Sequence, residues 1–262
     1  MMKISDFKAY KAAQKKISMV TCYDYTSAMI LSSSNVDCIL VGDSAAMTMH
    51  GHDSTLPISV GQMAIHTAAV KRGASGKFIV GDLPFLSYRK SLSENVEAAG
   101  RIMRAGAHSV KLEGARGNLE LVHHLVDSGI PVMGHLGLTP QSIHQIGGFK
   151  VQGKLAPEAQ IILEDSIALQ QAGCFALVLE CVPQQLAQKI SESLEIPTIG
   201  IGAGVGCDGQ VLVWQDLLGM NPNFKPKFLR RYSNLHETIQ SALNAFDQDV
   251  KQRKFPSKEE SY

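Results

Sequence analysis

Five largely apolar runs in this chain each stop within two residues of an ionisable side chain. The runs are 39–41, 78–80, 110–112, 131–133 and 176–179, and they lead to Asp43, Asp82, Glu113, His135 and Glu180. Short continuous apolar runs of this kind are typical of parallel strands that are buried on both faces. If such a sheet closes into a barrel, the carboxyl ends of all its strands lie on one face, and these five side chains converge there.

Strand-like and helix-like segments alternate along the whole chain, which favours an α/β fold, a (βα)8 TIM barrel. We expect eight strands near 18–23, 38–41, 78–80, 109–112, 132–134, 175–179, 198–201 and 210–213. Helices are expected at 25–34, 59–72, 91–105, 118–128, 157–171, 184–194 and 234–250. We predict one catalytic barrel domain over residues 1–250 and a polar C-terminal tail over 251–262.

Composition excludes several classes of protein. The 262 residues include 25 Lys and Arg against 24 Asp and Glu, a balance that argues against a nucleic-acid partner. No apolar stretch approaches the roughly 18 residues of a membrane span, and the first residues lack the apolar core of a signal peptide, so we expect a cytoplasmic protein without a membrane partner. Five cysteines in no metal-binding or disulfide spacing are expected to be free, mostly buried thiols.

Asp43 and Asp82 each follow a strand and a glycine. Carboxylates on neighbouring strand ends can hold Mg²⁺, which takes one or two protein carboxylates and completes its octahedron with substrate and water. Each aspartate alone could equally cap the following helix. Capping gives no reason for acids to gather on successive strands, so we favour the metal site.

Lys111 and Glu113 lie two apart on one strand and therefore point to the same side. A lysine inside a barrel must be paired or face a ligand. Lys111 is thus a candidate for binding a substrate carboxylate, and Glu113 for holding the metal directly or through water. A salt bridge to a neighbouring acid is the alternative.

Glu180 ends the most apolar strand of the chain, which suits a general base. The alternative is an acid that interacts with the dipole of the following helix. His135 occupies the same topological position, and we expect it to orient the substrate or an acid. The long segments 44–57 and 137–156 are expected to be loops, the second able to act as a lid.

Several motifs carry little information. Residues 204–209 match the dinucleotide-binding glycine pattern, but a strand-like segment follows where a helix is required. His50, His52, His123 and His124 lack a third convergent metal ligand and are expected on the surface or in loops. Ser91 begins a capping box with Glu94, and Gly106 and Gly129 stand where helices end.

The combination of many segments is more specific than any one of them. Segments 40–44, 48–57, 66–70, 82–85, 104–107, 110–114, 134–141, 150–153, 179–183 and 199–204 together resemble the ketopantoate hydroxymethyltransferase family. The resemblance extends from about residue 17 to residue 232. It implies a (βα)8 barrel of the phosphoenolpyruvate mutase and isocitrate lyase type, usually a homodecamer.

The resemblance also implies an activity: transfer of a hydroxymethyl group from 5,10-methylenetetrahydrofolate to 3-methyl-2-oxobutanoate. The product is 2-dehydropantoate, in the pathway to pantothenate and coenzyme A, and the reaction passes through an enolate stabilised by Mg²⁺. The implied partners are the keto acid and the folate.

The same resemblance implies roles for individual residues of this chain. The metal acids are Asp43, Asp82 and Glu113, the substrate-binding residues are Asp43, Ser44, Asp82 and Lys111, and the catalytic residues are Glu180 as proton acceptor with Lys111 and His135. The chain departs from the usual pattern at Ala45–Ala46, where a bulkier residue is common at the first position, and at Gln215, where histidine is common.

Two rival functions are weighed against this one. A Mg²⁺-dependent lyase of 2-oxo or 2-hydroxy acids from the same superfamily would use the same enolate but generally carries a catalytic cysteine on a mobile loop, and segment 137–153 has none. A non-catalytic, metal-stabilised binding protein would have no need for Lys111 and Glu180 to face one pocket.

Overall fold

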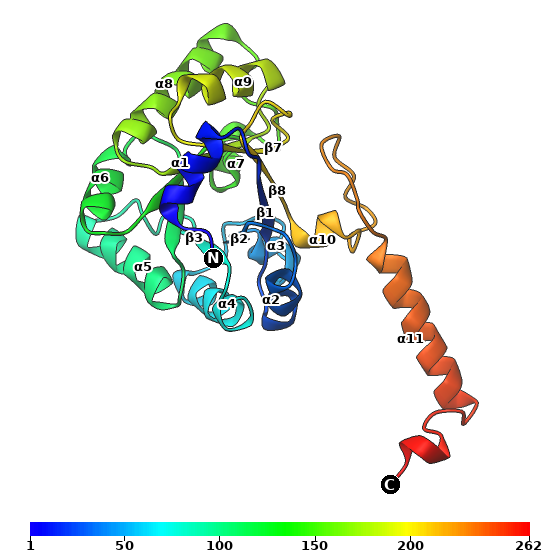
Figure 1. Ribbon diagram of the computed structural model, residues 1–262. Coiled ribbons are helices and arrows are strands. Elements are labelled where there is room, and N and C mark those ends of the chain that lie inside the picture. Colours follow the sequence, from blue (N-terminus) through cyan, green and yellow to red (C-terminus); the bar gives the residue numbers. More distant parts are fainter. The chain divides into compact units, whose positions relative to one another are not determined.

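Eight parallel strands form a closed barrel in the computed structural model, which describes residues 1–262 (Figure 1). The strands are β1 (Ile17–Thr21), β2 (Cys38–Val41), β3 (Phe78–Asp82), β4 (Ser109–Glu113), β5 (Val132–Gly137), β6 (Ala176–Glu180), β7 (Thr198–Ile201) and β8 (Gly209–Leu212). Each strand pairs with the next, and β8 pairs with β1 to close the barrel. The predicted fold class is confirmed.

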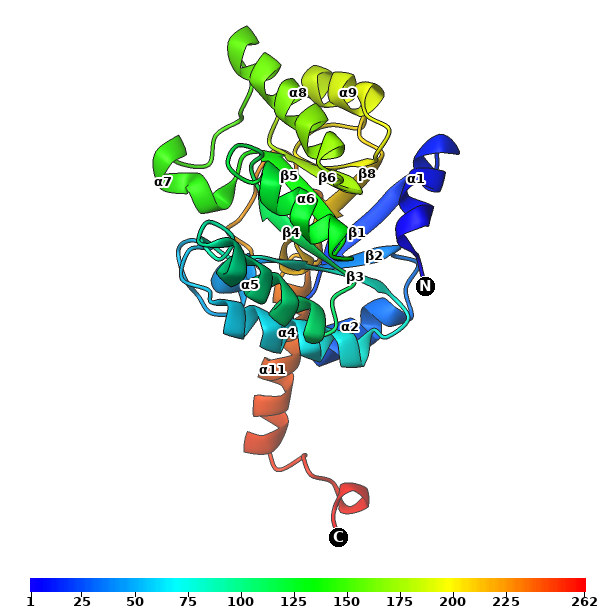
Figure 2. The ribbon, with the colours of Figure 1, turned by 90° about the vertical axis from the view of Figure 1, so that its left-hand side faces the viewer.

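Helices surround the barrel on its outer face (Figure 2). The longer ones are α2 (Tyr25–Ser32), α4 (Val60–Gly73), α5 (Leu92–Arg104), α6 (Leu119–Asp127), α8 (Ala156–Gln171) and α9 (Gln184–Ser193). The two segments predicted as long loops contain short helices, namely α3 (Ala45–Thr48), η1 (Pro140–Ser142) and α7 (Ile143–Ile146). Such single turns are too short to leave an apolar periodicity in the sequence.

The N-terminal end of the barrel is sealed by a helix that the sequence did not predict, α1 (Ile4–Ala12). Its fully buried Phe7 packs edge-to-face on Phe78 at 5.2 Å and on Phe175 at 4.9 Å between ring centroids. Phe7 is the one fully buried residue of α1, and the partly buried Ile4 and Tyr10 pack against the same core beside it. Because Phe7 joins the apolar core at this end, the polar chemistry is confined to the other end.

The chain divides into two compact units, Met1–Val213 and Trp214–Tyr262. This division differs from the predicted boundary at residue 250. The second unit contains α10 (Trp214–Leu217), α11 (Leu235–Lys251) and η2 (Lys258–Glu260). The predicted helix near 234–250 is present, but none of its side chains is buried, and periodicity alone does not say what a helix packs against.

The cysteines, the helix lengths and two glycines bear on further expectations from the sequence. All five cysteines are free, and four of them are buried. None of the helices is both long enough and apolar enough to cross a membrane. Gly106 and Gly129 have φ of 111° and 83°, as expected for residues that end helices in the left-handed region.

Helix α5 begins with the capping box predicted at Ser91. The Ser91 side chain accepts a hydrogen bond from the Glu94 N–H at 3.3 Å, and the Glu94 carboxylate accepts one from the Ser91 hydroxyl at 2.6 Å. Replacing Ser91 with alanine removes both interactions, and a lost N-cap costs about 1 kcal/mol. We expect Ser91→Ala to lower the free energy of unfolding by this amount in urea denaturation. The control is Ser93→Ala inside the same helix, and equal effects of the two changes would contradict the assignment.

Candidate active site

The strand register brings the predicted site residues together at the carboxyl end of the barrel. Asp82 at the end of β3 is in register with Lys111 on β4, and Glu113 is in register with His135 on β5. All four side chains are buried. Lys111 and Glu113 point to the same side of β4 because they lie two residues apart.

Lys111 lies between an acid and an imidazole. Its Nζ is 3.1 Å from Asp82 Oδ1 and 3.4 Å from His135 Nδ1. Burial alone would lower the pKa of Lys111, but the carboxylates of Asp82, Glu113 and Asp43 raise it above its ordinary value. Lys111 is therefore a permanent buried cation, suited to holding an anionic substrate group.

His135 connects two carboxylates. Its Nδ1 is 3.3 Å from Glu113 Oε1, and its Nε2 is 3.3 Å from Glu180 Oε2. Burial and the Lys111 charge lower the pKa of His135, but the two glutamates outweigh them and raise it to about 9. The imidazole thus orients Glu180, whose side chain at 19% exposure is the most accessible of the acids.

Glu180 is held close to β5 by a glycine. Gly137 has a φ of 91°, and a β-carbon at this position would collide with the carbonyl oxygen of Glu180. The N–H of Leu138 donates to the same carbonyl at 2.8 Å. A side chain at residue 137 would therefore displace Glu180.

The backbone of Asp43 is hydrogen-bonded to the side chain of Asp82. The Asp43 N–H donates to Asp82 Oδ2 at 3.0 Å. Burial, followed by the charges of Asp82 and Glu113, raises the pKa of Asp43 to about 8, and burial also raises the pKa of Asp82. In the metal-free protein Asp43 therefore retains a proton that a bound cation would displace.

Ser44 is oriented by a tyrosine that the sequence did not single out. The Tyr23 hydroxyl lies 2.8 Å from Ser44 Oγ. Burial raises the pKa of Tyr23 to about 12, so the phenol stays neutral. Two further buried residues in the cluster were missed, Tyr88 and Gln141, and Gln141 Nε2 donates to Asp43 Oδ2 at 2.8 Å.

The donor set fits a hard divalent cation. Asp82 Oδ1 and Glu113 Oε1 are buried oxygens without a hydrogen bond, although each faces a positive or titratable nitrogen at ion-pair distance. No group of three His, Cys, Asp or Glu side chains is arranged to hold a metal. Mg²⁺ takes one or two carboxylates from a protein and the rest of its ligands from substrate and water, so the two buried oxygens are the observation that supports the fit.

The histidines set aside in the sequence have other partners. His50 Nε2 lies 2.9 Å from His66 Nε2, and His66 Nδ1 lies 2.7 Å from the Tyr23 carbonyl oxygen. His123 pairs with Asp127 one turn along α6 at 2.9 Å. His50 and His123 are exposed, as predicted.

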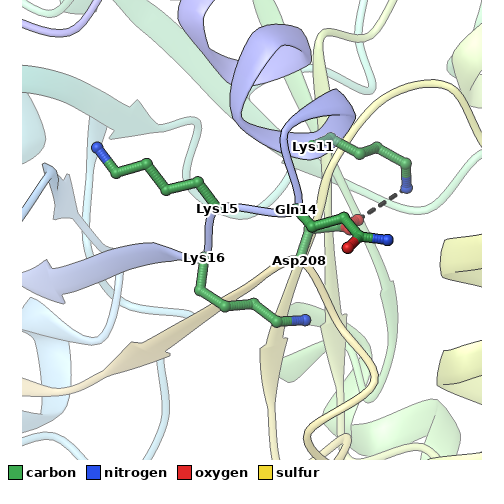
Figure 3. A pocket seen from close by; sticks show the side chains of 5 residues that line it. All are labelled: Lys11, Gln14, Lys15, Lys16 and Asp208. Atoms are coloured by element: carbon green, nitrogen blue, oxygen red, sulfur yellow. Dashed lines mark hydrogen bonds and ion pairs between the residues drawn. The ribbon is translucent and has the colours of Figure 1, made fainter.

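A cavity of about 370 Å³ is lined by none of the candidate site residues. Its lining residues are Lys11, Gln14, Lys15, Lys16 and Asp208. Lys11 reaches Asp208 at 2.8 Å, whereas Lys15 and Lys16 extend in other directions (Figure 3). Lys16 donates to the Cys207 carbonyl at 2.6 Å, and Lys15 lies over the Tyr10 ring. Since these lysines already have partners beside the start of β1, we assign this cavity no catalytic role.

Comparison with known proteins identifies the family. The ketopantoate hydroxymethyltransferase profile matches residues 1–258. The chain belongs to the ketopantoate hydroxymethyltransferase family. It is 61% identical over 262 residues to 3-methyl-2-oxobutanoate hydroxymethyltransferase of Bdellovibrio bacteriovorus, with 100% of both chains covered. It is 59% identical over 256 residues to the enzyme of that name from Coxiella burnetii, with 97% of this chain and 96% of the relative covered.

Solved structures support the fold of this hydroxymethyltransferase family member. The chain is similar to 2,3-dimethylmalate lyase, a member of the phosphoenolpyruvate mutase and isocitrate lyase superfamily, with a TM-score of 0.61 at 12% identity and coverage of 100% and 93%. It is similar to phosphonopyruvate hydrolase in complex with oxalate and Mg²⁺, with a TM-score of 0.64 at 10% identity and coverage of 99% and 93%. The predictions of an enzyme, a hydroxymethyltransferase, and of this barrel type are confirmed.

The buried acids make a prediction about stability and pH. The folded-state pKa of Asp43, about 8, lies above the ordinary value of roughly 3.9. The protonated Asp43 carboxyl thus contributes its full stability below about pH 4. As the pH rises to about 8 this contribution is lost, and the free energy of unfolding falls by on the order of 1 kcal/mol for each pH unit. We expect Asp43→Asn to stabilise the metal-free protein relative to the wild type more at pH 8 than at pH 5.

The measurement is urea unfolding in the presence of a chelator at both pH values. The control is Asp53→Asn, which changes an exposed aspartate of the next loop. A difference between Asp43→Asn and the wild type that is the same at pH 5 and pH 8 would contradict the proton assignment.

Proposed function

We propose that this protein transfers a hydroxymethyl group from 5,10-methylenetetrahydrofolate to 3-methyl-2-oxobutanoate and forms 2-dehydropantoate, on the pathway to pantothenate and coenzyme A. The observation that carries the proposal is the buried network in which Lys111 faces Asp82 and His135 faces Glu180. This network supports the proposal because a buried cation that could bind an anionic substrate and a carboxylate that could take a proton both contact His135. The choice of 3-methyl-2-oxobutanoate as the substrate follows from the names of the relatives.

Asp43 and Asp82 would hold a divalent cation, with Mg²⁺ the expected metal. Glu113 would support it through water, since Glu113 already accepts from the Gln141 N–H at 3.0 Å and lies beside His135. The Mg²⁺ in the phosphonopyruvate hydrolase complex supports this choice of metal. When bound, the cation supplies Lewis-acid stabilisation of negative charge on the keto-acid oxygens, worth several kcal/mol.

The keto acid would be bound by its carboxylate. Lys111 provides a buried positive charge, and the Ser44 hydroxyl, held by Tyr23, provides a hydrogen bond. Together with Asp43 and Asp82 these residues fix the substrate in one orientation. Such fixing is a large part of what an enzyme contributes to a reaction between two molecules.

Glu180 would remove the proton from C3 of the keto acid. Its carboxylate is more exposed than the other acids and is oriented by His135 Nε2 at 3.3 Å. Water would add to the methylene carbon of the opened folate, and the bond from that carbon to the folate nitrogen would then break, which releases formaldehyde and returns the electron pair to the nitrogen. The electron pair left on C3 then forms a carbon–carbon bond to the formaldehyde carbon, and the formaldehyde oxygen takes up a proton to become the hydroxyl of the product.

Segment 137–153 would cover the site during these steps. The Gln152 N–H donates to the Cys181 carbonyl at 2.8 Å, directly beside Glu180. Gly147 and Gly148 inside the segment and Gly153 at its end have positive φ, which lets the chain turn at these points. This segment contains no cysteine, which distinguishes the chain from the lyases considered above.

Assembly and location rest on the resemblance and on composition. A homo-oligomer, a decamer as the family resemblance implies, and a cytoplasmic location both stay predictions. Neither is needed for the roles given to the buried residues.

The role of Glu180 has a direct test. Glu180→Gln keeps the shape of the side chain but cannot accept the proton, so exchange of the C3 proton of 3-methyl-2-oxobutanoate into deuterated water should fall at least 100-fold. Calorimetric binding of the keto acid with Mg²⁺ should be unchanged. Nuclear magnetic resonance follows the exchange, with the exposed Glu158→Gln as control. Exchange at the wild-type rate in Glu180→Gln would assign the base to another residue.

A further inference from the structure

Gln141, in the turn η1 after β5, makes an unusual number of contacts for one buried side chain. Its Nε2 donates to Asp43 Oδ2 at 2.8 Å and to the Leu83 carbonyl at 3.0 Å, and its Oε1 accepts from the Tyr88 hydroxyl at 2.7 Å. Its backbone N–H donates to Glu113 Oε2 at 3.0 Å. One residue therefore contacts two of the three acids of the site.

The orientation of this amide is fixed by its neighbours. The Leu83 carbonyl can only accept, so the NH₂ group of Gln141 must face it. The Tyr88 hydroxyl accepts from the Glu113 N–H at 3.3 Å, which leaves its hydrogen for Gln141 Oε1. Rotating the amide would break three hydrogen bonds in a buried place, where water cannot replace the lost partners.

We propose that Gln141 and Tyr88 are positioning residues for the cation site. Tyr88 fixes the Gln141 amide, the amide fixes Oδ2 of Asp43, and the rotation of the Asp43 carboxylate is thereby restricted before the cation arrives. Neither residue is a metal ligand or touches the reacting atoms. This inference rests on the proposed function, in which Asp43 and Asp82 hold the metal.

The geometry explains why a glutamine and a tyrosine are both required. A carboxylate at residue 141 could not donate to Asp43, and a phenylalanine at residue 88 could not hold the amide. Partners of this indirect kind typically change metal affinity or activity by 10–100-fold when they are removed.

Manganese binding tests the proposal without turnover. Mn²⁺ suits the same oxygen ligands as Mg²⁺, and electron paramagnetic resonance counts the free ion. With the full-length protein, we expect Tyr88→Phe to weaken Mn²⁺ binding about 10-fold and Gln141→Met to weaken it by 10–100-fold. Circular dichroism should show both variants folded.

A double mutant separates positioning from general loosening of the fold. Because Tyr88 acts through Gln141, Tyr88→Phe combined with Gln141→Met should bind Mn²⁺ no more weakly than Gln141→Met alone. The control is Thr198→Val, which removes a buried hydroxyl bonded to Asp208 at the start of β7. This control should leave Mn²⁺ binding unchanged even if it lowers stability.

The outcomes are distinct. Wild-type affinity in Tyr88→Phe and Gln141→Met, additive losses in the double mutant, or an equal loss in Thr198→Val would overturn the positioning role and leave the proposed function in place. Two other outcomes would overturn the cation site and the positioning role together. They are a wild-type protein that binds no Mn²⁺, and an Asp82→Asn variant that binds Mn²⁺ as tightly as the wild type.

Discussion

The structure depends on a group of ionisable side chains that are buried together at one end of a barrel. Asp43, Asp82 and Glu113 are at most 5% exposed, and they face one permanent cation, Lys111, and the imidazole of His135. Removing charges from water is costly unless they are paired. Burial raises the pKa of Asp43 and of Asp82, which favours their uncharged, protonated forms and so lowers the cost. A bound divalent cation would pair with these carboxylates in their charged forms. The buried carboxylates that carry this cost in the metal-free protein are the groups proposed to hold the cation.

The barrel and the clustering of the candidate site residues could be predicted because both depend on simple patterns. Strands buried on both faces must be continuous apolar runs, and the ionisable residues that end them must lie on one rim once the sheet closes. The predicted strands at 38–41 and 198–201 match β2 and β7. Lys111 and Glu113 share a side of β4 because side chains alternate along a strand.

The rest could not be predicted, since it depends on contacts between residues that have no pattern in the sequence. Tyr88 and Gln141 are 53 positions apart, and only the folded chain places the hydroxyl of one against the amide of the other. Helix α1 was missed because its apolar face is short, with Phe7 fully buried and only Ile4 and Tyr10 partly buried beside it. The division into units after Val213 has no counterpart in the sequence, because the amphipathic pattern of α11 predicts a helix but not what it packs against.

Asp43 and Asp82 are proposed to hold one cation that also binds the keto acid. Crystals grown with Mn²⁺ and 3-methyl-2-oxobutanoate, measured at the manganese absorption edge, locate that ion directly by its anomalous scattering. We expect one strong peak in coordination contact with a carboxylate oxygen of each aspartate and with the keto acid beside Lys111. A bound keto acid with no peak there, or a peak that touches neither aspartate, would contradict this proposal.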